Sequence, residues 1–193
     1  MTIRAMTARR LPALLGGLLA LETVSAGQPA QAGVSVFGSS SAVLCYQTAE
    51  TGKGYVEGIR ECDRALDEAL SRPHRAATHV NRGIIQMHMA RYGRALADYD
   101  RALAIDGELG EAFVNRGIAK WHAGLDMTSA LADLDRGIAL GTTDEEIAHF
   151  IRALVHEELG NVSAAYFDLR RAAELNPAWE APRVELQRFQ VQG

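Results

Sequence analysis

The chain has 193 residues, enough for one hydrophobic core and short for two. Apolar residues make up 48% and charged residues 23%, as in globular proteins generally, while aromatic residues reach only 6%, which favours helices over strands. The net charge of -4, with Arg interleaved among Asp and Glu, argues against a nucleic-acid partner, because phosphate binding depends on clustered positive charge.

The first 32 residues have the pattern of an export signal. Arg4, Arg9 and Arg10 form a basic start, and an apolar run follows from Leu11 to Ala20. Ten residues rise about 15 Å as a helix, half of a bilayer core, so the run is too short for a stable membrane span. Ala30-Gln31-Ala32 matches the A-x-A site of signal peptidase. We therefore expect cleavage after Ala32 and a periplasmic or secreted protein, the alternatives being an uncleaved anchor or a disordered tail.

A linker and two helices are expected next. Residues 33–40 are rich in Gly and Ser and are expected to form a flexible leader. Residues 41–51 and 54–71 are expected to be helical, and Asp63-Arg64-Ala65-Leu66 echoes a pattern that returns in later helices. We interpret residues 41–72 as a degenerate helical hairpin.

The two cysteines, Cys45 and Cys62, fall on the two helices of this hairpin. An even number of cysteines in an exported chain favours a disulfide. Facing helices can also bring the two Cα atoms to about 5–6 Å, as a disulfide requires. The alternative is a pair of buried thiols, each packed as a small apolar side chain. We expect the disulfide.

The middle of the chain repeats itself with a period of about 34 residues. His79-Val80-Asn81-Arg82-Gly83-Ile84 returns as Phe113-Val114-Asn115-Arg116-Gly117-Ile118, and a weaker third copy includes Ile151-Arg152-Ala153. A fixed period of this length indicates an array of helical units. Glycines fall in or beside the short turns, where a left-handed conformation separates two helices: Gly93, Gly124 and Gly160. The expected helix pairs are 76–90 with 93–106, 110–123 with 127–140, and 146–159 with 162–175.

Small residues recur where the two helices of each pair would cross. They are Gly83, Gly117 and Ala153 in the first helices and Ala95, Ala130 and Ala165 in the second, with the large residues Tyr99, Leu134 and Leu169 between them. Helix axes approach to about 8 Å only where side chains are small. Over residues 76–177 this pattern resembles the tetratricopeptide repeat. The resemblance implies an all-α array of antiparallel helix hairpins, with units at 76–109, 110–144 and 146–177.

The match to that family departs from its pattern in two respects. The aromatic residue usual in the middle of the first helix is replaced by Gln86, Lys120 and His156. The proline that commonly ends each unit is present only as Pro177. These departures concern the details of the groove more than the fold.

The last residues, 178–193, are expected to cap the array. Residues 178–190 have the spacing of one amphipathic helix, with Trp179, Leu186 and Phe189 on its inner side. Pro182 fits a helix only in its first turn. A cap is needed because an array otherwise exposes its terminal apolar face.

Opposite charges recur in every copy of the repeat. The arginines are Arg82, Arg116 and Arg152, and the aspartates are Asp98, Asp133 and Asp168. Because both signs return in register, we interpret them as a structural ladder of ion pairs between helices, in preference to a ligand site. Partly exposed pairs of this kind contribute about 0.2–1 kcal/mol each.

A candidate peptide-binding groove follows from the resemblance, because members of the family expose their first helices as a concave face. An asparagine there can hold a peptide backbone, since its amide both donates and accepts hydrogen bonds. The expected groove residues are Asn81, Ile84, His88, Asn115, Ile118, His122, Phe150 and Leu154. The alternative is that Asn81 and Asn115 bind only neighbouring helices.

The sequence contains none of the common catalytic or phosphate-binding motifs. His88 and His122 recur in adjacent units, but no third metal ligand is evident, so we expect neither a metal nor a cofactor. The sequence therefore predicts a non-catalytic exported scaffold that binds a protein or peptide and is expected to be a monomer. The alternative is a self-associating structural module of an envelope complex.

Overall fold

The computed structural model describes residues 2–5, 33–35 and 39–192, and most of the predicted signal lies outside these ranges. The described residues form nine helices and two short strands. The helices are α1 (Ser40–Thr51), α2 (Tyr55–Asp67), α3 (Arg72–His88), α4 (Tyr92–Ile105), α5 (Gly110–His122), α6 (Met127–Leu140), α7 (Glu145–Glu158), α8 (Val162–Leu175) and α9 (Glu180–Leu186). The strands are β1 (Thr2–Ala5) and β2 (Phe189–Gln192).

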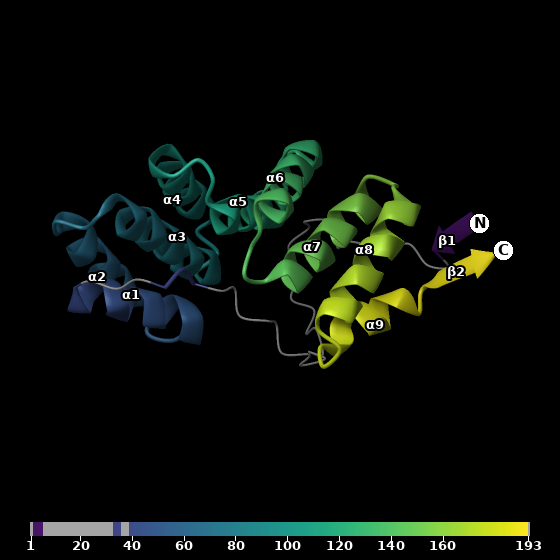
Figure 1. Cartoon of the computed structure of the whole chain (residues 1–193), viewed down its shortest axis with the longest axis horizontal. Helices are drawn as coiled ribbons and strands as arrows, with labels where there is room; N and C mark the ends of the chain where they lie inside the picture. The colour runs from purple at the N-terminus through teal and green to yellow at the C-terminus, as the bar shows by residue number, and fades with distance from the viewer. Residues whose placement is uncertain (1, 6–32, 36–38, 193) are drawn as a thin grey trace, which may run out of the picture.

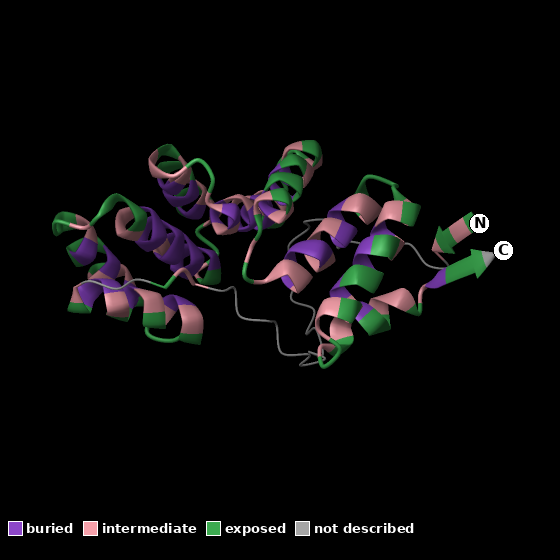
Figure 2. Ribbon diagram, in the orientation of Figure 1, coloured by how far each residue is buried: buried purple, intermediate pink, exposed green. Residues whose placement is uncertain are grey.

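Consecutive helices pack in pairs, α1 with α2, α3 with α4, α5 with α6 and α7 with α8, and the pairs follow one another in an arch (Figure 1). The first helices of successive pairs also contact one another, from α1 to α7. We call the side of the arch formed by α1, α3, α5 and α7 the inner face. Buried residues are concentrated on α3 and α5, which have neighbours on both sides (Figure 2). The predicted all-α hairpin array is confirmed.

The turn of the first full repeat differs from the prediction. Gly124 and Gly160 have φ of 64° and 78°, in the left-handed region, as expected for turns between two helices. In the α3–α4 turn the left-handed residue is Ala90, with φ of 53°, while Gly93 is the second residue of α4. A non-glycine residue is strained there, so Ala90 occupies the position that glycine has in the next two repeats.

The helix crossing of the first full repeat depends on Gly83. A Cβ atom added to Gly83 would lie 2.4 Å from Cε1 of Tyr99, whose ring is fully buried in the core. Because Tyr99 is packed on all sides, the added methyl group would push α3 and α4 apart. The large residue of the second helix thus fills the space left by the small residue of the first.

We expect Gly83→Ala to lower the free energy of unfolding by about 1–3 kcal/mol, the usual effect of overpacking. Gly93→Ala is the matched control, because nothing lies within 4 Å of its added Cβ. It should leave stability unchanged or raise it by up to about 1 kcal/mol, since Ala favours helix over Gly. Urea unfolding followed by circular dichroism measures both. Equal midpoints for the two variants would contradict close packing at Gly83.

The first hairpin contains the predicted disulfide. Cys45 on α1 and Cys62 on α2 are joined, with their Cα atoms 4.8 Å apart, and both side chains are fully buried. Helix α2 ends at Asp67, earlier than the expected 71, because the backbone becomes extended at Glu68. Ser71 then caps the next helix by accepting a hydrogen bond from the amide of His74.

The C-terminal cap is shorter than predicted. Helix α9 ends at Leu186, and the chain then continues as β2, which pairs antiparallel with β1 in the register Ala5↔Phe189. Trp179 and Phe189 still pack inward as expected, against Phe150 and Tyr166 respectively. Strand β1 belongs to the segment predicted as an export signal. Within the described residues, no helix is both long and apolar enough to cross a membrane.

Candidate functional site: the inner face of the array

The predicted ladder of ion pairs is present in all three repeats. The Arg82 guanidinium donates from Nε to Asp98 Oδ2 at 2.9 Å and from Nη2 to Asp98 Oδ1 at 2.6 Å. Arg116 with Asp133, and Arg152 with Asp168, have the same two-pronged geometry at 2.7–2.8 Å. Each pair joins the first helix of a hairpin to the second helix, at the equivalent position in every repeat.

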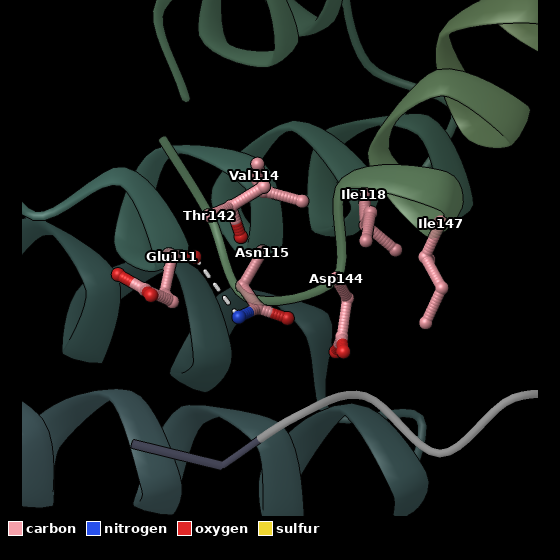
Figure 3. A pocket seen from close by; sticks show the side chains of 7 residues that line it. All are labelled: Glu111, Val114, Asn115, Ile118, Thr142, Asp144 and Ile147. Atoms are coloured by element: carbon pink, nitrogen blue, oxygen red, sulfur yellow. Dashed lines mark hydrogen bonds between the residues drawn. The ribbon is translucent and has the colours of Figure 1, made fainter. Parts of the chain in front are cut away.

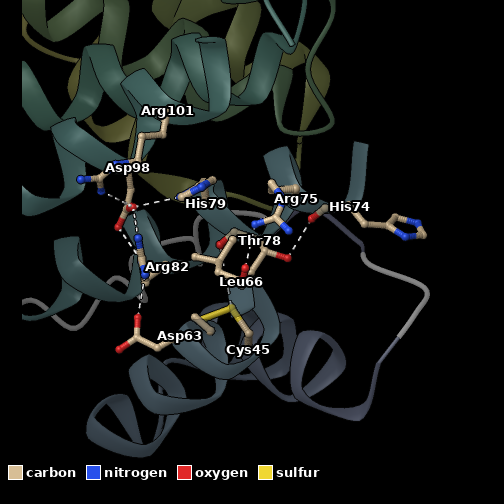
Figure 4. A network of polar contacts seen from close by, with 11 residues as sticks. Cys45, Asp63, Leu66, His74, Arg75, Thr78, His79, Arg82, Asp98 and Arg101 are labelled. Atoms are coloured by element: carbon tan, nitrogen blue, oxygen red, sulfur yellow. Dashed lines mark hydrogen bonds and ion pairs between the residues drawn. A yellow bond between two sulfur atoms is a disulfide. The ribbon is translucent and has the colours of Figure 1, made fainter. Parts of the chain in front are cut away.

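Each of these arginines also binds the preceding hairpin, a contact that the charges recurring within each repeat did not indicate. Arg82 donates from Nη1 to Asp63 on α2 at 2.6 Å, as Figure 4 shows. The equivalent bonds run from Arg116 to Asp100 at 2.7 Å and from Arg152 to Asp135 at 2.8 Å. The Asp-Arg dipeptides that recur in the second helices could have indicated these contacts, because their aspartates accept the bonds. The ladder therefore connects hairpins to one another as well as closing each of them.

Two of the ladder aspartates, Asp98 and Asp168, are buried and have lowered pKa values. Burial alone would raise the pKa of the Asp98 carboxyl, but hydrogen bonds from His79 and Arg82 outweigh it and lower that pKa. The pKa of Asp168 is lowered in the same way by Arg152 and His149. With their charges satisfied inside the array, these groups are structural, and the prediction of a structural role is supported.

Asn81 contacts a backbone segment on the inner face. Its Oδ1 accepts a hydrogen bond from the amide of Val34 at 2.7 Å, and its Nδ2 donates to the carbonyl of Val34 at 2.8 Å. The Asn81 side chain is fully buried beneath this segment, and the Val34 side chain packs beside Ala42 and Ala77. Asn81 thus holds an extended stretch of the chain's own leader by both of its backbone groups.

One repeat further, Asn115 lies at the wall of a pocket that opens onto solvent. Its Nδ2 donates to the carbonyl of Glu111 at 2.9 Å, and among the described residues no donor reaches its Oδ1. The polar ends of Asn115 and Asp144 point the same way (Figure 3). The pocket is lined by Glu111, Val114, Asn115, Ile118, Thr142, Asp144 and Ile147. Of the predicted groove residues, Asn115 and Ile118 meet here.

Known structures share this architecture. The chain superposes on the crystal structure of MamA with a TM-score of 0.61 at 18% identity, covering 78% of this chain and 82% of that one. For the TPR domain of Arabidopsis OM64 the TM-score is 0.57 at 19% identity, covering 61% of this chain and 96% of that one. A tetratricopeptide-repeat protein from Parabacteroides merdae gives 0.59 at 22% identity, covering 77% of this chain and 58% of that one.

This chain has the tetratricopeptide-repeat fold. At these identities the likeness concerns the fold alone. No protein-family model matches the sequence, and no curated protein matches it.

The tetratricopeptide-repeat fold places the other predicted groove residues in different surroundings. Ile84 and Leu154 lie in the packed interior, with 0% and 3% of their surfaces exposed. Phe150 is covered by the Trp179 ring, with the two ring centroids 4.8 Å apart. None of these three meets Asn115 in its pocket. They stabilise the units that carry the inner face.

His88 and His122 end their helices and have equivalent partners. His88 stacks on Tyr55 with ring centroids 5.4 Å apart, and His122 stacks on Tyr92 at 6.0 Å. In each case the tyrosine begins the second helix of the preceding hairpin. Burial lowers the pKa of both imidazoles, which therefore stack as uncharged rings at neutral pH. Their repetition is explained by packing between units.

The ladder aspartate of the second repeat has different additional partners from those of the first and third repeats. His79 and His149 donate to the ladder aspartates of the first and third repeats, whereas Phe113 stands at that position in the second. The Arg116 guanidinium lies over the Phe113 ring, 5.3 Å from its centroid. Lys120 lies 2.7 Å from Asp133 and supplies the additional positive charge. Thus Lys120, which departs from the family's pattern, has a role inside the array.

Within the part of the chain that the structure describes, no three His, Cys, Asp or Glu side chains are grouped so as to hold a metal ion.

Proposed function

We propose that this chain is a non-catalytic, exported scaffold that binds a protein or peptide on its inner face. The observation that carries the proposal is the contact between the Asn81 amide and both backbone groups of Val34. Such a contact recognises extended backbone whatever its side chains are. Asn115 repeats the same residue one unit further along, beside a pocket, and no donor among the described residues reaches its Oδ1.

Export is the part of the proposal that rests on the sequence of residues 1–32. The buried disulfide between Cys45 and Cys62 supports it, because such bonds persist in oxidising compartments outside the cytosol. Cleavage after Ala32 would remove β1 together with the rest of the signal and would make Gly33 the first residue of the exported protein.

We expect Asn115→Ala to weaken the binding of a partner by about 5- to 150-fold. The partner is one that the wild-type chain retains from an envelope extract. That range corresponds to about 1–3 kcal/mol, the penalty for a peptide backbone group left without its hydrogen bond. Stability should change by less than about 1 kcal/mol, because the hydrogen bond that Asn115 loses is one to its own helix. The measurement is a binding isotherm with the purified partner, together with a melting curve of the same variant.

Asn161→Ala is the matched control, since Asn161 is exposed at the α7–α8 turn, away from the pocket. It should bind as the wild type does. An Asn115→Ala variant with full affinity and a native melting curve would contradict binding through Asn115. Light scattering after size-exclusion chromatography tests the alternative function, because a self-associating module would elute as a homo-oligomer and the proposed scaffold as a monomer.

A further inference from the structure

The start of the described leader lies in a close-fitting site between α1 and α3. The backbone N–H of Gly33 donates to the Glu50 carboxylate, and the next residue, Val34, is held by Asn81. A Cβ atom on Gly33 would lie 3.0 Å from Asn81 Oδ1, 3.0 Å from Glu50 Oε1 and 3.1 Å from the Tyr46 ring. These distances leave little room for a side chain, so the site fits glycine.

The chemical identity of this donor changes if the chain is cut after Ala32. Gly33 N is then an α-ammonium group in place of an amide, since hydrolysis of the Ala32–Gly33 peptide bond releases a free amine that is protonated at neutral pH. A carboxylate is the partner that such a cation requires, and Glu50 is already within hydrogen-bond distance of that nitrogen. The contact would become a charge-assisted hydrogen bond, which is generally shorter and stronger than a hydrogen bond between neutral groups.

We infer that Glu50, Tyr46 and Asn81 form a receptor for the chain's own processed N-terminus, a free α-ammonium on glycine followed by an extended Val. The inference rests on the proposed cleavage after Ala32. Glu50 binds the ammonium group, Tyr46 limits the first residue to glycine, and Asn81 holds the second residue by its backbone. The processed leader then stays on the inner face and occupies the Asn81 position, which leaves the Asn115 pocket as the entry for an outside peptide.

Two further features of the surroundings support a receptor for this N-terminal segment. No Lys or Arg contact with the Glu50 carboxylate is present among the described residues, and its described hydrogen bond is the one from Gly33. The second residue of the leader is anchored by its side chain as well, because Val34 packs against two of the core clusters. The segment is therefore held at three successive points: the nitrogen of Gly33, the backbone of Val34 and the side chain of Val34.

The test begins with the mass of the protein recovered from an envelope fraction, which should correspond to a chain starting at Gly33. That chain is then exposed briefly to an amine-acetylating reagent at pH 7, and modification of the Gly33 amine is quantified by peptide mass spectrometry. We expect the folded wild-type chain to react roughly tenfold more slowly than the same chain in urea, because the paired ammonium must first leave Glu50. The exposed Lys53 is the internal reference for the reagent.

Glu50→Gln removes the charge and keeps the shape, and it should restore acetylation of Gly33 to within about twofold of the unfolded rate. Glu57→Gln is the control in the same hairpin, since Glu57 pairs with Arg60 and Arg64, and it should leave Gly33 protected. Equal reactivity in the wild type and in Glu50→Gln would overturn the receptor alone. An exported chain that retains Met1 would overturn both the receptor and the proposed cleavage.

Discussion

Asp98→Ala should lower the free energy of unfolding by about 3–5 kcal/mol, while Asp63→Ala should lower it by no more than about 1 kcal/mol. Both aspartates accept a hydrogen bond from Arg82 at 2.6 Å, so distance does not distinguish them. Burial does, because 3% of the Asp98 side chain is exposed against 55% of the Asp63 side chain. Removing a buried partner leaves other buried charge without compensation, whereas water replaces an exposed one.

Asp98 also has more partners to lose. His79 and Arg101 each contact it at 3.1 Å, in addition to the two bonds from Arg82. In a chain of this size each kcal/mol shifts the melting temperature by about 2–4 °C. Asp98→Ala should therefore melt about 6–20 °C lower, and Asp63→Ala at most about 4 °C lower. Calorimetry on the two variants measures these shifts. Equal decreases in melting temperature would show that burial does not determine how much each ion pair of the ladder contributes to stability.

The ion pair between Arg82 and Asp98 also predicts how the stability of the protein depends on pH. Because the pKa of Asp98 is lowered on folding, its contribution to stability is fully present above the ordinary Asp pKa, near 3.9. That contribution is lost as the pH falls through the lowered pKa of the folded state. The difference in stability between the wild type and Asp98→Ala should therefore be constant near neutral pH and shrink below about pH 4.

Reducing the bond between Cys45 and Cys62 should lower the free energy of unfolding by about 3 kcal/mol, and the melting temperature by about 6–12 °C. The two residues are separated by 17 positions, and closing a loop of that length restricts the unfolded chain by about this amount. Thiol titration of the exported protein in denaturant should find no free thiol. Melting curves with and without reductant then give the shift.

Replacing both cysteines by alanine is the control for reductant acting elsewhere. The double variant should melt at a temperature that reductant does not change. Because both sulfur atoms are fully buried, the reductant must be added under conditions that open the hairpin, such as moderate urea, before the protein is refolded. Two free thiols in the exported protein, or a wild-type melting curve that reduction leaves unchanged, would contradict a stabilising disulfide.

The parts of the fold that follow from local patterns could be predicted from the sequence. The 34-residue period and the small residues at helix crossings place the six helices from α3 to α8 within four residues of their ends. The ladder followed from opposite charges recurring in register, as with Arg82 and Asp98. These features repeat in every unit, so each copy supports the interpretation of the others.

The parts that depend on contacts across the chain could not be predicted. Strand β2 replaces the end of the expected capping helix because it pairs with β1 at the opposite end of the sequence, and no local pattern signals such a pairing. Glu50 was missed for a similar reason, since its partner is the backbone of Gly33 and backbone atoms leave no trace in a sequence. Asn81 was identified by its residue type, but the sequence could not indicate that the chain itself would occupy it.

Arg82, Arg116 and Arg152 each belong to two hairpins at once, and this has a consequence for how the array unfolds. In a one-dimensional description of repeat proteins, stability is the sum of the terms for single units and the coupling terms between neighbours. Here one guanidinium enters both kinds of term, through Asp98 within a unit and Asp63 between units. When one hairpin opens, the aspartate of the preceding hairpin therefore loses its arginine partner. The shared arginine therefore adds a weak coupling term, of no more than about 1 kcal/mol, to the packing between neighbouring hairpins.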